Sequence, residues 1–249
     1  MRCRRRSSSC PAATVRKMET VITCVTSREY TASVRRYAEW AAARLSLPLE
    51  YLDQAEARKL HRTVLHDMID REARTSLFVV GKARPVAPAL SVHYWNLEGA
   101  IRVLRRPILR ASRTFRAPLR FAVGFDGTPF GRRLLETVSN SALLAGLACR
   151  VMVAGRAKAA ACNQLRWAEL TLRDAGFQVA GQLLPDDSEA AICACIDEAD
   201  IDLLVLAMPW EWGVKEFFLG STLSLIRTCP VPVLIYPHSP VLLGRRHMP

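Results

Sequence analysis

The chain has 249 residues, of which 50% are hydrophobic and 23% are charged, and its formal net charge is +12. This composition is typical of a folded globular protein with enough apolar material for two small cores, so we do not expect a disordered chain. Every apolar run is shorter than the ~20 residues that a membrane-spanning helix needs, so we do not expect a membrane protein.

The first seventeen residues are rich in Arg and Ser and contain no acidic residue. They lack the apolar core of a secretory signal, so three interpretations stay open: an organellar targeting segment, a disordered arm, or an extension from a misplaced start codon. We favour the last two, and we set residues 1–18 apart from the folded part. The tail alone supplies half of the net positive charge, through Arg2, Arg4, Arg5, Arg6, Arg16 and Lys17.

A first set of elements follows the tail. Val21–Thr26 predicts a buried strand, and apolar side chains at helical spacing then predict a helix. Further strands are predicted up to Leu52, at Leu77–Gly81 and at Pro107–Arg110. The segment between Asp53 and Leu77 is too short for a helix, a strand and another helix, so this copy is expected to lack its third strand. The predicted helix face is formed by Val34, Tyr37, Ala38, Ala41, Ala42 and Leu45.

A second copy of the plan begins one hundred positions later, at Phe121–Asp126. Apolar positions predict a helix that continues through Ala142 and Ala145, and the later pattern predicts helices at Cys162–Ala175 and Ser188–Asp200. Strands are predicted at Cys149, Phe177–Leu184, Asp202–Ala207 and Pro230–Tyr236. An unbroken apolar run such as Asp202–Ala207 suits a parallel strand that is covered on both faces. We therefore predict an α/β protein with domains at 19–112 and 119–238, a linker at 113–118 and a C-terminal tail at 239–249.

Eight cysteines invite a disulfide interpretation, but their positions favour small hydrophobic roles in strands and helices. Cys193 and Cys195 are two residues apart on a predicted helix and point in different directions, so we expect no metal site there. Free thiols favour a reducing cytoplasm. A second basic stretch runs through the linker, and we interpret it as a solvated linker or a surface facing acidic partners. It contains Arg102, Arg105, Arg106, Arg110, Arg113, Arg116 and Arg120.

The order and spacing of these segments resemble the universal stress protein family in its tandem two-domain form. The resemblance rests on a strand that ends in Asp126-Gly127-Thr128, an amphipathic helix, the run from Lys215 to Ser221, and a closing Pro-Val-Leu strand. It covers nearly everything from Val21 to Tyr236. It implies two Rossmann-like domains with parallel sheets in the order 3-2-1-4-5, the first of them truncated. It also implies that the two last strands pair, which makes the monomer a pseudo-dimer, and a homodimer is the further expectation.

The resemblance also implies a nucleotide site in the second domain, with ATP or another adenine nucleotide as the ligand. In ATP-binding members an acid at the end of the first strand contacts the nucleoside, and a glycine-rich loop ending in Gly-Ser or Gly-Thr meets the phosphates. Here Ala207 and Trp210 stand where the two loop glycines are expected, and Pro209 has no N–H to offer. The candidate site residues are Asp126, Gly127, Thr128, Ala207, Met208, Trp210, Gly220, Ser221 and Thr222.

The first domain departs further from the family pattern. Thr26 replaces the acid, Arg84 replaces one loop glycine, and Tyr94-Trp95 replaces Gly-Ser, whereas Gly81 is kept. We interpret this domain as a structural or regulatory partner.

Plainer interpretations of the same residues stay open. Asp126 is equally suited to capping the next helix or holding a turn with Gly127, and Gly220-Ser221 to a simple helix cap. Trp210 and Trp212 suit a filled pocket or a contact surface. The sequence contains no phosphate-binding loop with a Gly-Lys-Ser/Thr ending, no Gly-x-Ser-x-Gly elbow and no His-Glu-x-x-His, so we assign no catalytic and no metal residues.

The leading hypothesis is a cytoplasmic, non-catalytic stress-response protein whose second domain binds an adenine nucleotide weakly. The alternative is a ligand-free protein-interaction module with vestigial nucleotide sites and unknown protein partners. A basic nucleic-acid-associated regulator is the second alternative, which we do not favour because stacking aromatic residues and a recognisable reading helix are missing from the sequence.

Overall fold

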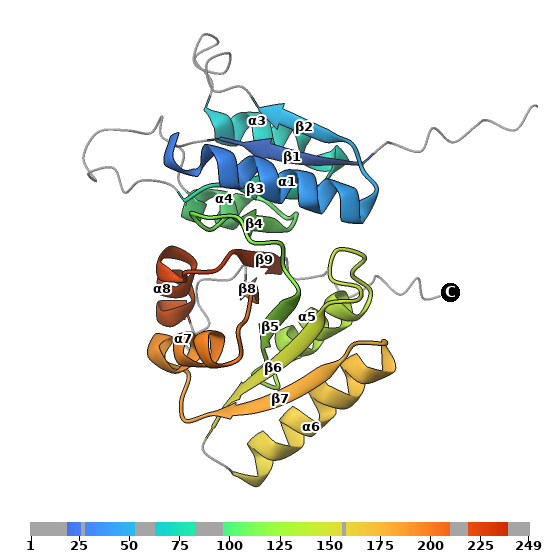
Figure 1. Cartoon of the computed structure of the whole chain (residues 1–249), viewed down its shortest axis with the longest axis vertical. Coiled ribbons are helices and arrows are strands. Elements are labelled where there is room, and N and C mark those ends of the chain that lie inside the picture. The colour runs from blue at the N-terminus through green and yellow to red at the C-terminus, as the bar shows by residue number, and fades with distance from the viewer. Residues whose placement is uncertain are drawn as a thin grey trace, which may run out of the picture.

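The computed structural model describes residues 19–25, 28–52, 63–82, 97–155, 158–209 and 219–238. In these residues nine strands form one sheet, in the order β2-β1-β3-β4-β9-β8-β5-β6-β7 (Figure 1). All neighbouring strands run parallel except β4 and β9, which run antiparallel. The predicted α/β class with a mostly parallel sheet is confirmed.

The first half of the molecule holds the segments up to the linker. Its described residues contribute four strands, β1 (Thr20–Cys24), β2 (Leu49–Leu52), β3 (Thr75–Val80) and β4 (Ile108–Arg110), in the order β2-β1-β3-β4. Its helices are α1 (Thr31–Leu45), α3 (Val64–Arg71) and α4 (Leu97–Val103), with short 3-10 turns at Arg28–Tyr30 and Glu72–Arg74.

The second half contributes five strands in the order β9-β8-β5-β6-β7, which is the predicted order 5-4-1-2-3. These are β5 (Arg120–Gly124), β6 (Ala148–Ala154), β7 (Val179–Leu184), β8 (Leu203–Pro209) and β9 (Val233–His238). The helices are α5 (Pro129–Ser139), α6 (Ala159–Asp174), α7 (Glu189–Glu198) and α8 (Leu219–Thr228). The segments predicted from apolar spacing are all found, with shifted ends.

The prediction that the first of these helices continues through Ala142 and Ala145 is wrong, because α5 ends at Ser139. The side chain of Asn140 donates from Nδ2 to the carbonyl oxygen of Glu136, 2.8 Å away. A polar side chain that bonds to the backbone in this way competes with helix propagation. The chain then turns before β6, through Gly146 with φ of +76°. Apolar spacing alone could not detect this end.

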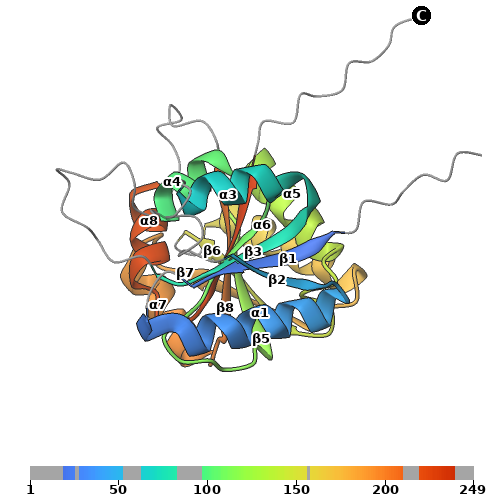
Figure 2. The ribbon, with the colours of Figure 1, turned by 90° about the horizontal axis from the view of Figure 1, so that it is seen from above.

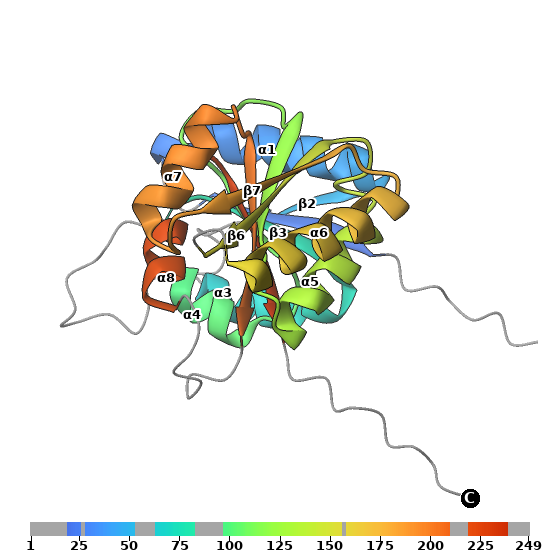
Figure 3. The same cartoon turned by 90° about the horizontal axis from the view of Figure 1, so that it is seen from below.

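Two cores lie on opposite faces of the sheet. Side chains of α1, α5 and α6 form the first, with Val34, Leu134 and Leu172 among the fully buried ones. Side chains of α3, α4, α7 and α8 form the second, which includes Met68 and Ile226. Figure 2 shows α1 opposite α3 and α4 across the sheet, and Figure 3 shows α5 and α6 opposite α7 and α8. Helix α8 packs on the second face.

The two halves meet at β4 and β9. Ile108, Leu109 and Arg110 face Ile235, Leu234 and Val233, so the two short strands join the halves into one continuous sheet (Figure 1). Helix α1 adds a contact through Arg44, whose Nε donates to the carbonyl oxygen of Leu143 at 2.6 Å. An exposed sheet edge is a template for unwanted pairing, and this junction removes one edge from each half.

The arginines of the linker region form contacts within the chain, and Arg110 alone among those that follow is buried, which corrects the expectation of a solvated stretch at that position only. Arg110 is 2% exposed. Arg116 pairs with both oxygens of Asp200, at 3.0 and 3.3 Å, and Arg120 pairs with the same carboxylate at 2.6 Å. Arg113 lies 3.0 Å from Glu29. Much of the basic stretch therefore serves internal contacts.

The carboxylate of Asp202 binds the backbone at the start of β5. Its carboxylate is 3% exposed, and Oδ2 accepts hydrogen bonds from the backbone N–H groups of Leu119 and Arg120, both at 3.0 Å. Arg116 Nε lies 2.9 Å from Oδ1. A residue that begins an apolar run thus carries a buried charge that is paired, as buried charges must be.

The remaining predictions concern the cysteines, membrane-spanning helices and the two tails. Cys24, Cys149, Cys195 and Cys229 are buried thiols, as expected for small hydrophobic side chains, whereas Cys162 is exposed. None of the helices described is long and apolar enough to cross a membrane. The tails at 1–18 and 239–249 lie outside the described residues.

Candidate functional site

The carboxyl ends of β5 and β8 lie side by side, because the two strands pair in parallel from Phe121 with Leu203 to Val123 with Val205. From β5 the chain proceeds to β6 on one side, whereas β8 lies on the other side. The strand order therefore reverses between β5 and β8. In open parallel sheets, ligands bind beyond the carboxyl ends of the strands at such a point.

Asp126 follows β5 at this reversal point and holds a tight turn. Its Oδ1 accepts hydrogen bonds from the N–H and the hydroxyl of Thr128, at 2.9 and 2.7 Å. The Thr128 hydroxyl oxygen in turn accepts from the N–H of Gly131, at 3.1 Å, which caps the N-terminus of α5. The interpretation of Asp126 as a turn residue is thus realised in the fold, whereas the cap of α5 is Thr128. These bonds use Oδ1, and within the described residues no hydrogen bond uses Oδ2.

Two glycines let this turn close. Gly127 has φ of +76°, a left-handed conformation that favours glycine, and an added Cβ would collide with the side chain of Gln164 from α6. At Gly131 an added Cβ would collide with Asp126 Oδ1 and lie 3.0 Å from the ring of Phe125. Helix α6 therefore packs directly over the Asp126 turn.

Two of the residues expected in the phosphate loop lie inside β8. Ala207 is half-buried and faces Tyr236 of β9, and Met208 is 6% exposed and packs in the second core. A buried Met208 side chain leaves only its backbone for a ligand. Strand β8 continues to Pro209, which faces His238. Trp210 lies outside the described residues, so its place in the site is untested.

Gly220, Ser221 and Thr222 lie in the first turn of α8, where the sequence predicted a helix start. Strands β8 and β9 are parallel, so α8 carries the chain from the carboxyl end of β8 back to the amino end of β9. The N-terminus of α8 therefore lies, like Asp126, at the carboxyl ends of the parallel strands. A helix N-terminus presents free N–H groups that suit an anion.

In the first half, Gly81 is the residue that keeps the expected glycine, and the space beside it is filled by neighbouring side chains. Gly81 is buried at the end of β3, and an added Cβ would lie 3.0 Å from Cβ of Tyr30 and 3.2 Å from Val34. Helix α1 and the turn before it thus fill this position. Thr26, Arg84 and Tyr94-Trp95 lie outside the described residues.

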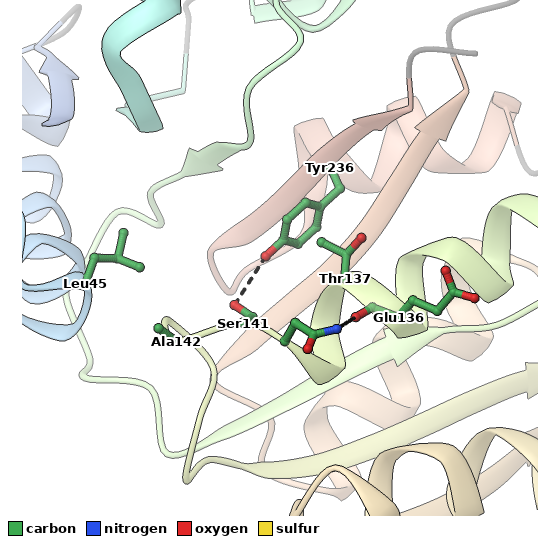
Figure 4. A pocket seen from close by; sticks show the side chains of 7 residues that line it. Leu45, Glu136, Thr137, Ser141, Ala142 and Tyr236 are labelled. Atoms are coloured by element: carbon green, nitrogen blue, oxygen red, sulfur yellow. Dashed lines mark hydrogen bonds between the residues drawn. The ribbon is translucent and has the colours of Figure 1, made fainter. Parts of the chain in front are cut away.

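A groove of about 550 Å³ lies elsewhere, at the opposite end of α5 from Asp126 (Figure 4). Leu45 from α1 faces it across from Glu136, Thr137 and Tyr236. The Tyr236 and Ser141 hydroxyl oxygens are 3.5 Å apart, and burial raises the pKa of Tyr236. Sequence reasoning missed this groove because its residues come from both halves and share no motif. The described residues contain no group of three His, Cys, Asp or Glu side chains that could hold a metal.

Comparison with known proteins shows which family the chain resembles. The model of the Universal stress protein family matches residues 150–237, which is most of the second half. A universal stress protein of Synechocystis sp. is 26% identical over 183 residues, which are 71% of this chain and 64% of the relative. By both comparisons the chain is similar to universal stress proteins, most clearly in its second half. It spans somewhat less than two thirds of that relative's length.

Solved structures extend this similarity at the level of the fold. A universal stress protein from Archaeoglobus fulgidus has a TM-score of 0.55 at 18% identity, covering 86% of this chain and 81% of its own. A functionally unknown protein from Pseudomonas aeruginosa has a TM-score of 0.51 at 14% identity, covering 90% of this chain and 83% of its own. Both comparisons extend over the two halves, so the universal stress fold is not confined to the segment that the family model matches.

Proposed function

We propose that this protein is a universal stress protein that binds an adenine nucleotide at the carboxyl ends of β5 and β8, and that it acts in the stress response by binding rather than by catalysis. One observation carries the proposal. Asp126 and the N-terminal turn of α8 both lie at the carboxyl ends of the strands, where the strand order reverses. Similarity to the universal stress protein family supports the ligand class, and the two halves would then be a tandem pair joined as a pseudo-dimer through β4 and β9.

The residues divide the work of such a site in a simple way. Asp126 uses Oδ1 to hold its own turn, which keeps the carboxylate in place and leaves Oδ2 for the hydroxyl and amino groups of a nucleoside. Gly220 and Ser221 offer backbone N–H groups at a helix start, where a phosphate is favoured by the helix dipole. Among the described residues no side chain with an obvious acid or base role joins them, and we propose binding without chemistry.

The ligand-free interaction module is the second candidate, and the end of β8 favours it. Met208 is buried and Pro209 has no N–H, so this loop offers less backbone to phosphates than a glycine-rich one. Trp210 follows directly in the sequence. A Trp210→Gly variant separates the candidates: improved nucleotide binding indicates a blocked but competent site, and unchanged absence of binding favours the module. Nucleic-acid binding is the weakest candidate, because Arg110 is buried and Arg116 and Arg120 already pair with Asp200 of the same chain.

The test is to purify the full chain gently, denature it, identify any released nucleotide, and then titrate the nucleotide-free protein with ATP by calorimetry. We expect an adenine nucleotide to be released and ATP to bind. Asp126→Asn keeps an oxygen for the Thr128 turn but removes the charge, so we expect affinity to fall roughly ten- to hundredfold, as for a lost hydrogen bond to a charged group.

Glu136→Gln is the matched control, since it makes the same change at the other end of α5 and should leave ATP affinity unchanged. A wild-type protein that releases no nucleotide and gives no heat with ATP would reject the proposed ligand. We propose a cytoplasmic location, which free buried thiols support. Protein partners and a homodimer remain proposals for which size measurement in solution is the first test.

A further inference from the structure

Arg110 is the last residue of β4, and it reaches from the first half of the molecule into the second. Its Nη2 donates to the carbonyl oxygens of Cys229 at 2.9 Å and Val231 at 2.7 Å. Its Nη1 lies 3.4 Å from the carbonyl oxygen of Ala111. The side chain is 2% exposed, so these carbonyl groups are its surroundings rather than water.

One accepting carbonyl, that of Cys229, lies at the C-terminal end of α8, and the other, that of Val231, lies in the turn between α8 and β9. Cys229 directly follows the last helical residue, Thr228, and its N–H still donates to the carbonyl oxygen of Leu225 at 2.9 Å. The last carbonyls of a helix have no partner within the helix, and a cation there also complements the helix dipole. Arg110 therefore caps α8 from another part of the fold.

The charge of Arg110 strengthens this assignment. Burial lowers the pKa of its guanidinium, with Cys229 the largest opposing influence, but an arginine stays charged in proteins. Among the described residues no carboxylate pairs with it. A buried cation of this kind depends on the carbonyl oxygens, so any displacement of the end of α8 would leave it unsolvated and unpaired.

A second contact from the first half reaches the same turn of α8. Glu98 of α4 accepts from Nε of Arg227 at 2.7 Å, and Figures 1 and 2 show α4 beside α8. Within the second half, Ser224 and Thr228 donate to Glu189 of α7. The C-terminal turn of α8 is thus held from two sides, and one of these sides belongs to the first half.

We infer that the first half of the chain positions the nucleotide-binding end of α8 by capping its other end, with Arg110 as the positioning residue. Helix α8 has ten residues and is about 15 Å long, so a shift of its C-terminal turn moves its first turn as well. This inference rests on the proposed function, which places a phosphate at that first turn. It gives the first half a role even though its own crevice is closed at Gly81.

The experiment uses the full chain and ATP as the probe. Arg110→Met removes the donors and keeps an unbranched side chain, and we expect the Kd for ATP to rise at least about tenfold. Arg110→Lys keeps a charge and a donor, and should bring the Kd back to within about threefold of wild type. Arg120→Met removes an exposed arginine of the same basic stretch and should leave the Kd unchanged.

Hydrogen exchange of the α8 amides is the second readout, and it does not require ATP. Exchange should be faster in Arg110→Met than in wild type and Arg120→Met. If Arg110→Met does not fold, Glu98→Gln, which loosens the same turn through Arg227, takes its place. An unchanged ATP Kd in a folded Arg110→Met protein overturns the inference, and so does failure of Arg110→Lys to restore binding. If the wild-type protein does not bind ATP, the proposed function is overturned. A difference in hydrogen exchange between Arg110→Met and wild type would in that case show only that Arg110 is a structural cap.

Discussion

At the scale of single residues, two carboxylates that are two positions apart have opposite surroundings. Asp202 is 3% exposed and accepts from two backbone N–H groups, whereas the side chain of Asp200 is 55% exposed and pairs with Arg116 and Arg120 at the surface. Hydrogen bonds to a buried charged group stabilise a fold more than surface ion pairs do. The sequence alone does not distinguish the two.

We therefore expect Asp202→Asn to lower the free energy of unfolding by about 1–3 kcal/mol, because the amide keeps one acceptor but loses the charge facing Arg116. Asp200→Asn is the matched control, since it makes the same change at the exposed position and Asn tolerates its left-handed backbone, φ of +51°. Its effect should be small. Urea unfolding of both variants measures the difference, and equal losses would contradict the assigned roles.

Gly131 shows how a residue can be required for what surrounds it. Alanine favours a helix over glycine, so propensity alone predicts that Gly131→Ala stabilises α5. The added Cβ would instead collide with Asp126 Oδ1 and press on Phe125, so we expect a loss of about 1–3 kcal/mol, as for overpacking. Gly124→Ala is the control, because its Cβ would meet only Leu206, at an ordinary 3.9 Å. Stabilisation by Gly131→Ala would refute the tight Asp126 turn.

At the scale of elements, α8 is held by its neighbours more than by its own sequence. The carboxylate of Glu189 in α7 accepts hydrogen bonds from the hydroxyl groups of Ser224 and Thr228. These bonds hold the pKa of the carboxyl below the ordinary 4.5, and the bond from Ser224 has the larger effect. A lowered pKa in the folded state stabilises the fold above the ordinary value. That contribution is lost as the pH falls through the folded-state pKa.

Glu189→Gln should therefore have a lower Tm than wild type at neutral pH, and the difference should shrink as the pH falls below 4.5. The carboxyl is exposed, so the effect should be modest and should weaken with salt. Thermal unfolding from pH 7 down to about pH 3 checks this. A difference that stays constant over that range would show that the α7 to α8 contact does not depend on the charge of Glu189.

Helix ends are the elements least visible in the sequence. The apolar spacing that correctly indicated α1, α6 and α7 also extended α5 too far, because Ala142 and Ala145 are exposed residues of a turn rather than residues of a helix. What ends α5 is a single side chain, Asn140, bonding back to Glu136. Spacing reports which side chains face a core, and it does not report a competing polar bond.

At the scale of the whole molecule, the sheet and the first core run through both halves without a break. Leu109 is fully buried, lies in β4, and pairs with Val79 of β3 and Leu234 of β9. A continuous core favours one cooperative unfolding transition in place of two independent ones.

Leu109→Ala should thus lower stability by about 2–5 kcal/mol while keeping a single calorimetric transition. Its effect should reach β5 and β8 in the second half as well as β1 and β3. Two separated transitions in wild type, or in the variant, would show that the halves fold independently and that β4 and β9 join them only weakly. Differential scanning calorimetry with comparison of calorimetric and van't Hoff enthalpies makes the measurement.

The sequence by itself determined the class of the fold, the nine strand segments and the position of Asp126 at the end of a strand. These features depend on local spacing and on two copies of one plan, both of which can be read along the chain. The tertiary structure alone decided that Arg110 is buried, that Asp202 is paired, that Met208 faces the core and that a groove lies beside Tyr236. These outcomes join segments more than eighty residues apart, as for Asp202 with Leu119 and Arg110 with Cys229, and no local pattern encodes which distant backbone group a side chain will meet.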